Sequence, residues 1–152
     1  MTLRTVSTSS DVTEKLGERL GSKLRGGEVI ELISDLGGGK TTFVRGLAKG
    51  MGSRDKVSSP SFTISHEYTA KGHKPSKLVH FDFYRLASAG LMANELTDWL
   101  NDSDVSIIIE WAGIVKNVLP NKRLTINIKV LDKNRREFKY NYPKQLSYLV
   151  EK

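Results

Sequence analysis

One short stretch of the chain combines residue types that can bind polyphosphate. It reads SDLGGGKTT, runs from Ser34 to Thr42, and lies between the apolar run VIELI and the segment FVRGLAKG, whose pattern is typical of a helix. The stretch nearly matches the phosphate-binding pattern G-x-x-x-x-G-K-[ST], in which a glycine-rich loop opens a helix. It departs from the pattern at Ser34, where glycine is usual. The first question is therefore whether this loop still binds a nucleotide.

The residues of this loop supply the groups that a polyphosphate needs. Three consecutive glycines let the backbone approach a phosphate closely and adopt positive φ angles without strain: Gly37, Gly38 and Gly39. A helix that begins near Lys40 presents its N-terminus to the anion. We expect Lys40 to reach the β- and γ-phosphates, the Thr41 hydroxyl to ligate Mg²⁺, and Thr42 to hydrogen-bond the α-phosphate.

The loop also has a plainer interpretation, in which a glycine turn simply precedes an amphipathic helix. The apolar strand before the loop and the helix after it favour the phosphate site, because phosphate loops require that context. Ser34 fits without strain if its φ is negative, whereas a positive φ costs roughly 1–2 kcal/mol. Most N–H groups around the phosphates come from later loop residues. We therefore expect nucleotide binding to be retained.

Two carboxylates follow apolar strands and are candidates for metal or water contacts. Asp82 comes after Leu78–Phe81, and Glu110 comes after Ile107–Ile109. Enzymes with a phosphate loop use an acidic residue at the end of a neighbouring strand to hold Mg²⁺ or to orient water. A charged residue at such a position can also mark only the place where a strand meets water. The presence of both carboxylates together with the loop favours the functional interpretation.

The elements that must position these side chains alternate between strands and helices. Apolar periodicity and capping residues predict helices from Ser9 or Ser10 to Gly26-Gly27, from Lys40 to Met51 and from Leu91 to Leu100. Alternation and turn residues predict strands at Leu3–Ser7, Glu28–Ile33, Phe62–Thr69, Lys77–Tyr84, Val105–Ile109, Leu124–Val130 and Arg136–Tyr140, the last two forming a hairpin. This order predicts a layered α/β domain with a mixed sheet.

Length and composition predict one globular domain. The chain has 152 residues, of which 38% are apolar and 27% charged, as in proteins with a single core. We expect residues 1–152 to form that domain, with 143–152 as a tail. The absence of cysteine excludes disulfides and thiolate zinc sites. No signal segment and no apolar run of about 18 residues are present, so we expect a cytoplasmic protein without membrane contact.

The formal net charge of +7 is concentrated toward the C-terminus. Residues 101–152 contain ten Lys or Arg against six Asp or Glu. Such a surface can attract phosphates, nucleic acid or an acidic protein. A solvated surface is an equally good interpretation, because no aromatic residues are interleaved as in stacking platforms.

Four segments in a fixed order give the chain a family resemblance. DLGGGKTT, VSSPSFT, HFDFYRL and IIIEWAG occur in this order, and together they resemble the TsaE family of P-loop ATPases. The similarity extends from about Val12 to Arg136. It implies a three-layer P-loop NTPase fold with a central mixed, mainly parallel sheet and antiparallel C-terminal strands. Compared with the usual pattern of the family, Ser34 replaces Gly, Gly38 replaces Ala and Ser61 replaces Thr.

The resemblance also implies roles for individual residues. Lys40 and Thr41 would bind phosphate and Mg²⁺, with Gly37, Gly38, Gly39 and Thr42 lining the phosphates. Glu110 would contact Mg²⁺, and Asp82 would be important for hydrolysis. Trp111, beside Glu110, is expected to pack over the nucleotide or a partner, with core packing as the alternative. The segment Ser59, Pro60, Ser61 and Phe62 would act as a switch near the γ-phosphate. Looser patterns place Ser10, Thr13 and Arg135 near adenine.

The activity implied by the resemblance is Mg-dependent hydrolysis of ATP to ADP and phosphate, weak in the isolated protein. In the family this reaction supports turnover of the TsaB–TsaD complex, which forms N6-threonylcarbamoyladenosine in tRNA. The basic C-terminal part would then lie near a protein partner or tRNA.

His80 is expected to be a core or rim residue of a strand rather than a catalytic group.

Two other functions fit the loop. The G-K-T-T sequence also occurs in the phosphate loops of small-molecule and nucleotide kinases. Such an enzyme needs an acceptor pocket and usually a lid, for which the chain has little spare length. A nucleotide-binding module without turnover would explain Ser34 as the mark of a decayed site. A GTPase is disfavoured, because the chain contains no N-K-x-D motif.

Overall fold

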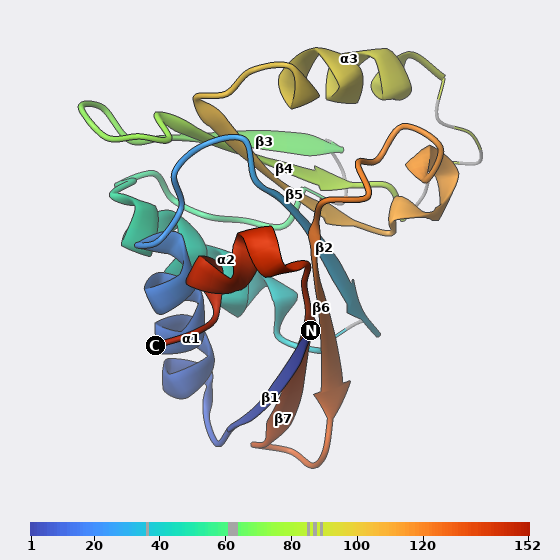
Figure 1. Ribbon diagram of the computed structural model, residues 1–152. Coiled ribbons are helices and arrows are strands. Elements are labelled where there is room, and N and C mark those ends of the chain that lie inside the picture. Colours follow the sequence, from blue (N-terminus) through green and yellow to red (C-terminus); the bar gives the residue numbers. More distant parts are fainter. Residues whose placement is uncertain (36, 61–63, 85, 87, 89) are drawn as a thin grey trace.

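A seven-stranded mixed sheet runs through the computed structural model, which describes residues 1–35, 37–60, 64–84, 86, 88 and 90–152 (Figure 1). Within these residues the strand order is β1-β7-β6-β2-β5-β4-β3. The strands are β1 (Thr2–Ser7), β2 (Val29–Ser34), β3 (Ser65–Thr69), β4 (Lys77–Asp82), β5 (Val105–Glu110), β6 (Leu124–Val130) and β7 (Arg136–Asn141).

The centre of the sheet is parallel and its margins are antiparallel. Strand β2 pairs in parallel with both β5 and β6, and β4 pairs in parallel with β5. The C-terminal strands β6 and β7 form the predicted antiparallel hairpin, β1 pairs antiparallel with β7, and β3 pairs antiparallel with β4. The predicted α/β class with a mixed sheet is therefore confirmed.

Helices cover the two faces of the sheet and complete three layers (Figure 1). Helices α1 (Ser10–Gly21) and α2 (Lys40–Met51) lie on one face, and α3 (Gly90–Leu100) lies on the other. The central strand β5 supplies both cores, because Ile108 belongs to the cluster under α1 and α2 whereas Ile107 and Ile109 belong to the cluster under α3. None of the helices formed by the described residues is long and apolar enough to cross a membrane.

Helix α1 is shorter than its apolar periodicity predicts. Ser9 caps its N-terminus by accepting a hydrogen bond from the Val12 amide, but the helix ends at Gly21 rather than at Gly26-Gly27. The Glu28 carboxylate accepts hydrogen bonds from the amides of Arg25 and Gly26 at 2.6 and 2.9 Å. Before that point the Lys23 and Leu24 amides already donate to the carbonyls three residues back instead of four, so the prediction extended the helix too far.

Several strand ends also differ slightly from the expected positions. Strand β4 ends at Asp82 instead of Tyr84, and β7 ends at Asn141 instead of Tyr140. Strand β3 begins at Ser65, while the expected start at Phe62 lies outside the described residues. In the parallel β4–β5 pair, Asp82 lies directly opposite Glu110. This register brings the two predicted carboxylates together.

Residues 143–152 do not extend away from the domain as a tail. They include the 3₁₀ helix η2 (Lys144–Leu149), whose Leu146 and Leu149 are buried in the core beneath α1 and α2. The hydroxyl of Tyr148 also donates a hydrogen bond to Glu28 at 2.7 Å. Apolar residues three positions apart lie on the same side of a short helix, and this pattern packs the segment against the sheet.

Candidate functional site

The glycine-rich loop joins β2 to α2 at the carboxyl ends of the parallel strands. Gly37 and Gly39 have φ angles of 77° and 92°, which only glycine adopts without strain. Gly39 directly precedes α2, so the free amides at the start of that helix point toward the loop. Ser34 does not adopt a positive φ. A serine is therefore free of backbone strain at this position.

A cavity of about 350 Å³ lies in front of the loop. Residues predicted to bind phosphate, metal or water line it together with the serine of the expected switch segment: Gly37, Gly38, Gly39, Lys40, Thr41, Thr42, Ser59, Asp82 and Glu110. The structure thus gathers the loop and both carboxylates in one place. Ser61 and Phe62, the other half of the expected switch, lie outside the described residues.

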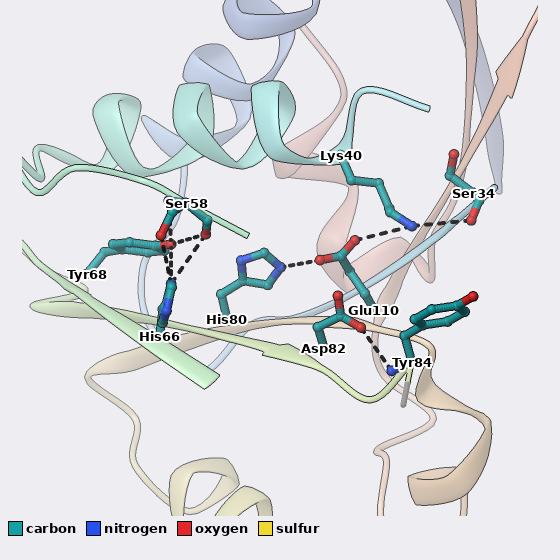
Figure 2. Close-up of polar contacts among 9 residues, drawn as sticks. All are labelled: Ser34, Lys40, Ser58, His66, Tyr68, His80, Asp82, Tyr84 and Glu110. Atoms are coloured by element: carbon teal, nitrogen blue, oxygen red, sulfur yellow. Dashed lines mark hydrogen bonds and ion pairs between the residues drawn. The ribbon is translucent and has the colours of Figure 1, made fainter. Parts of the chain in front are cut away.

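Among the described residues, the ammonium group of Lys40 lies near a carboxylate, a backbone carbonyl and an aromatic ring. Its Nζ lies 3.4 Å from Oε1 of Glu110 and 3.4 Å from the Ser34 carbonyl oxygen (Figure 2). It also lies 5.2 Å from the centre of the Trp111 ring, a distance that permits a cation–π interaction. A flexible lysine in contact with a carboxylate can turn toward a phosphate when one enters the loop.

The carboxylate of Glu110 is buried between a histidine and a lysine. Its residue is 3% exposed, and Oε2 lies 2.6 Å from Nε2 of His80 (Figure 2). Burial alone would raise the pKa of Glu110, but the hydrogen bond from His80 and the nearby Lys40 together hold this pKa below its ordinary value. Glu110 is therefore a carboxylate at neutral pH.

Asp82 lies beside Glu110 at the end of the neighbouring strand. It is 5% exposed, and its Oδ1 accepts a hydrogen bond from the Tyr84 amide at 2.9 Å. That bond ties the carboxylate to the turn that follows β4. Two adjacent carboxylates on parallel strands suit a site that binds a cation and water in front of a phosphate loop.

Trp111 has an unusual backbone at the edge of this site. Its φ of 56° is in the left-handed region, which is strained for an aromatic residue. The ring packs against Tyr84, with a centroid distance of 4.8 Å, and remains 40% exposed. Both aromatic side chains thus border the site on the side of Lys40.

A second cavity of about 310 Å³ continues from the other side of the loop. It is lined by loop residues, by the start of α1 and by the β6–β7 turn: Ser9, Ser10, Thr13, Gly37, Gly39, Thr42, Lys133, Asn134 and Arg136. Ser10 and Thr13, for which the resemblance implies a place near adenine, thus line a cavity next to the phosphate loop. Arg135 does not line this cavity; its Nε donates to Asp132 at 2.6 Å, and the neighbouring Arg136 takes its place.

The segment before the expected switch is attached to β3. The Tyr68 hydroxyl donates to the Ser58 carbonyl at 3.0 Å, and His66 Nδ1 lies 3.4 Å from the Ser58 hydroxyl (Figure 2). Ser59 follows at the edge of the first cavity. These contacts position the start of the segment next to the phosphate loop.

The oxygen groups of the first cavity suit Mg²⁺. The Thr41 hydroxyl and the carboxylates of Asp82 and Glu110 line the same space, and Mg²⁺ prefers oxygen ligands. The described residues contain no cluster of three or more His, Cys, Asp or Glu side chains able to hold a metal alone. Mg²⁺ that binds together with substrate phosphates needs only one or two protein carboxylates.

The comparison with protein families agrees with this geometry. The family model described as "Threonylcarbamoyl adenosine biosynthesis protein TsaE" matches residues 7–138. The chain belongs to the TsaE family. The matched range contains the loop, both carboxylates, all of β6 and the first half of β7. The predicted family is therefore confirmed.

Individual relatives extend the match over most of the chain. A protein from Streptomyces coelicolor named tRNA threonylcarbamoyladenosine biosynthesis protein TsaE is 42% identical over 115 residues, which cover 75% of this chain and 76% of that protein. A protein of the same name from Treponema pallidum is 36% identical over 135 residues, covering 89% and 97%. The crystal structure of YdiB from Bacillus subtilis matches with a TM-score of 0.79 and 30% identity, covering 99% and 93%. This TsaE family likeness confirms the P-loop NTPase fold.

Two residues of the site do not follow from the sequence motifs alone. His80 was expected in the core or at the rim, and it is indeed buried, but its ring contacts Glu110. The spacing H-x-D is the available signal, since residues two apart on a strand share a face and His80 must point the same way as Asp82. For Arg136 the sequence gives no such signal. Only the conformation of the β6–β7 turn decides that Arg136 lines the second cavity while Arg135 pairs with Asp132.

Proposed function

We propose that this TsaE family protein hydrolyses ATP to ADP and phosphate in the biosynthesis of tRNA N6-threonylcarbamoyladenosine. Its curated relatives are named for that modification. The observation that carries the proposal is the single cavity that joins Lys40, Thr41, Asp82 and Glu110 at the N-terminus of α2. A phosphate loop with two carboxylates opposite it is an arrangement for phosphoryl transfer to water.

The loop and Lys40 bind the phosphates in this proposal. The amides that follow Gly37 and the start of α2 supply hydrogen bonds and partial positive charge. Lys40 leaves Glu110 and Ser34 and turns toward the β- and γ-phosphates, where its charge stabilises the transition state. The second cavity, with Ser10, Thr13 and Asn134 at its wall, accommodates the nucleoside.

The two carboxylates divide the remaining tasks. The Thr41 hydroxyl and Glu110 would hold Mg²⁺, which supplies positive charge at the β- and γ-phosphates when bound. Oε2 of Glu110 stays with His80, and Oε1, which Lys40 leaves when it turns to the phosphates, would be taken by the metal, so neither oxygen is left over for a water molecule. Asp82 is the better candidate to orient the attacking water.

We further propose that the ATPase is weak in the isolated protein and is stimulated by TsaB–TsaD, whose turnover it supports. The Tyr84–Trp111 pair offers a contact for such a partner, because the two residues are 43% and 40% exposed and Trp111 lies beside Lys40. The kinase alternative requires an acceptor site in addition to the two cavities that this proposal assigns to the nucleotide.

An ATPase assay with and without TsaB–TsaD tests this function. We expect slow turnover that the partners increase, and a loss of about 100-fold or more in Lys40→Ala and in Glu110→Ala. Lys49→Ala is a matched control on α2, since Lys49 is exposed and pairs with Glu18. Wild-type rates in Lys40→Ala would refute the site. Normal binding without hydrolysis, even with both partners, would identify a binding module, and phosphorylated acceptors in place of free phosphate would identify a kinase.

A further inference from the structure

His80 contacts the site through one ring nitrogen only. The side chain is 1% exposed, and Nε2 lies 2.6 Å from Oε2 of Glu110. The other nitrogen, Nδ1, has no hydrogen-bond partner among the residues that the structure describes. The ring hydrogen is assigned to the nitrogen that has an acceptor, and a carboxylate oxygen can only accept. His80 therefore donates to Glu110.

The two oxygens of Glu110 consequently face different groups. Oε2 accepts from His80, whereas Oε1 lies 3.4 Å from the Lys40 ammonium. In Figure 2 the carboxylate lies between the ring and the ammonium, with Lys40 on the side of the phosphate loop. One oxygen is thus turned toward the loop and the other is turned away from it.

These two contacts differ in permanence. Lys40 is on the loop side and is the group that a phosphate attracts, so its contact with Glu110 is lost when nucleotide binds. His80 is fixed by strand β4, which pairs with β5 and places His80 opposite Ile108, two residues before Glu110. A glutamate side chain has three rotatable bonds, and holding it in one rotamer without a partner costs entropy. His80 is the contact that remains.

We propose that His80 is a positioning residue that holds Glu110 by Oε2, so that Oε1 alone faces the phosphate loop. Oε1 is then available to Lys40 in the free protein and to the metal when nucleotide is bound. This inference rests on the proposed function, because it assigns Glu110 to the metal. Hydrogen-bond partners of metal ligands typically contribute about 10–100-fold in metal affinity.

Two amide substitutions of His80, which are similar in polarity, distinguish a role in positioning Glu110 from a role in packing. A glutamine at position 80 can place an N–H donor near the position of Nε2, whereas an asparagine amide reaches only as far as Nδ1. We would measure ADP binding by calorimetry to wild type, His80→Gln and His80→Asn, first without metal and then across a series of Mg²⁺ concentrations. Thermal unfolding of each protein accompanies the titrations.

We expect His80→Asn to raise the Mg²⁺ concentration of half-maximal effect by about tenfold or more. His80→Gln should stay within about threefold of wild type, and metal-free ADP affinity should change by less than about threefold in both, because the phosphate loop is intact. A wild-type Mg²⁺ response in His80→Asn would overturn the inference. Equal losses in both variants, with metal-free affinity also reduced, would show a packing role and overturn it as well.

The two proposals fail in different ways. Wild-type protein that binds no ADP, or binds it without any response to Mg²⁺, contradicts the proposed function before any His80 variant is made. Normal wild-type behaviour with an unchanged His80→Asn contradicts only the positioning role. If His80→Asn does not fold, His80→Gln decides alone: a Mg²⁺ response like wild type supports the inference, and a tenfold shift overturns it.

Discussion

Ser34 and Gly38 share one small volume at the base of the phosphate loop. A Cβ atom added to Gly38 would lie 1.8 Å from Oγ and 3.1 Å from Cβ of Ser34. The usual TsaE pattern has glycine at the first of these positions and alanine at the second. The serine side chain here takes the space that the alanine methyl group would need. The two departures from the pattern therefore compensate each other.

This compensation predicts coupling between the two positions. We expect Gly38→Ala to destabilise the protein and weaken ADP binding when Ser34 is present, and to be tolerated together with Ser34→Gly. Residues in direct contact typically couple by about 0.5–3 kcal/mol, so a coupling free energy near 1 kcal/mol is expected. Urea unfolding and ADP titration of wild type, both single variants and the double variant measure it. Additive effects would contradict the shared volume.

Ser34→Gly alone should change ADP affinity by less than about threefold.

The residues of the site differ in how far the sequence predicts them. Lys40, Thr41, Asp82 and Glu110 each belong to a local pattern, a loop before a helix or a charge after an apolar strand, and local patterns are visible in one sequence. The contact between His80 and Glu110 depends instead on the register of β4 against β5. Register between distant strands is set by the whole sheet, so the H-x-D spacing indicates only that His80 and Asp82 share a face and not that His80 contacts Glu110.

At the level of elements, helices α1 and α2 approach each other through glycines. A Cβ atom on Gly17 would lie 2.1 Å from the Phe43 carbonyl oxygen, and one on Gly46 would lie 1.9 Å from the Glu14 carbonyl oxygen. Phe43 belongs to the first turn of α2, directly behind Lys40. The close approach thus fixes α1, which lines the nucleoside cavity, against the helix that carries the phosphate loop.

This approach predicts that Gly17→Ala impairs both stability and nucleotide binding. A methyl group at position 17 has no space, and overpacking of this kind typically costs about 1–3 kcal/mol. Separation of the helices should also move the loop and weaken ADP binding. Gly113→Ala is the matched control, because a Cβ atom there meets nothing within 4 Å. Chemical denaturation and ADP titration of both variants check the prediction; a Gly17→Ala protein as stable as the control would contradict it.

Element boundaries show which parts of the fold the sequence could not predict. The strands and α2 were close to their expected bounds, because apolar alternation and glycine at helix ends are local signals. Helix α1 was predicted too long, since Leu24 continues the apolar period although the helix ends at Gly21 and the Glu28 carboxylate binds the amides of Arg25 and Gly26. The C-terminal helix η2 was missed for a similar reason. Its position depends on the packing of Leu146 and Leu149 in the core and on a contact with Glu28, all far away in the sequence.

Across the whole molecule, Glu28 connects three distant parts of the chain. Its carboxylate is 3% exposed and accepts hydrogen bonds from the Arg25 and Gly26 amides before β2. It also accepts from the Ser106 hydroxyl in β5 at 2.6 Å and from the Tyr148 hydroxyl in η2 at 2.7 Å. A buried carboxylate is stable only when hydrogen bonds satisfy it. The C-terminal segment is therefore part of the folded domain.

The Tyr148 hydroxyl provides the test of this connection. In Tyr148→Phe the ring can still stack on Arg25, which lies 3.9 Å from its centroid, but Glu28 loses one donor. Loss of one partner of a buried charged group typically costs about 1–3 kcal/mol, so we expect a lower free energy of unfolding by urea at pH 7. Tyr84→Phe is the control, because Tyr84 is 43% exposed. Equal stability of the two variants at pH 7 would contradict the role of Glu28.

The same hydroxyl predicts how stability depends on alkaline pH. Burial and then Glu28 raise the pKa of Tyr148 above its ordinary value of 10.0. A raised pKa in the folded state means that the stabilising contribution is complete below the unfolded-state pKa and is lost as pH rises above it. The free energy of unfolding of wild type should thus fall as pH increases above about 10. Tyr148→Phe should show a smaller decrease, with the remainder due to other buried tyrosines such as Tyr140. Urea unfolding from pH 8 to 11 measures both slopes, and identical slopes would show that Tyr148 does not keep its proton in the folded protein.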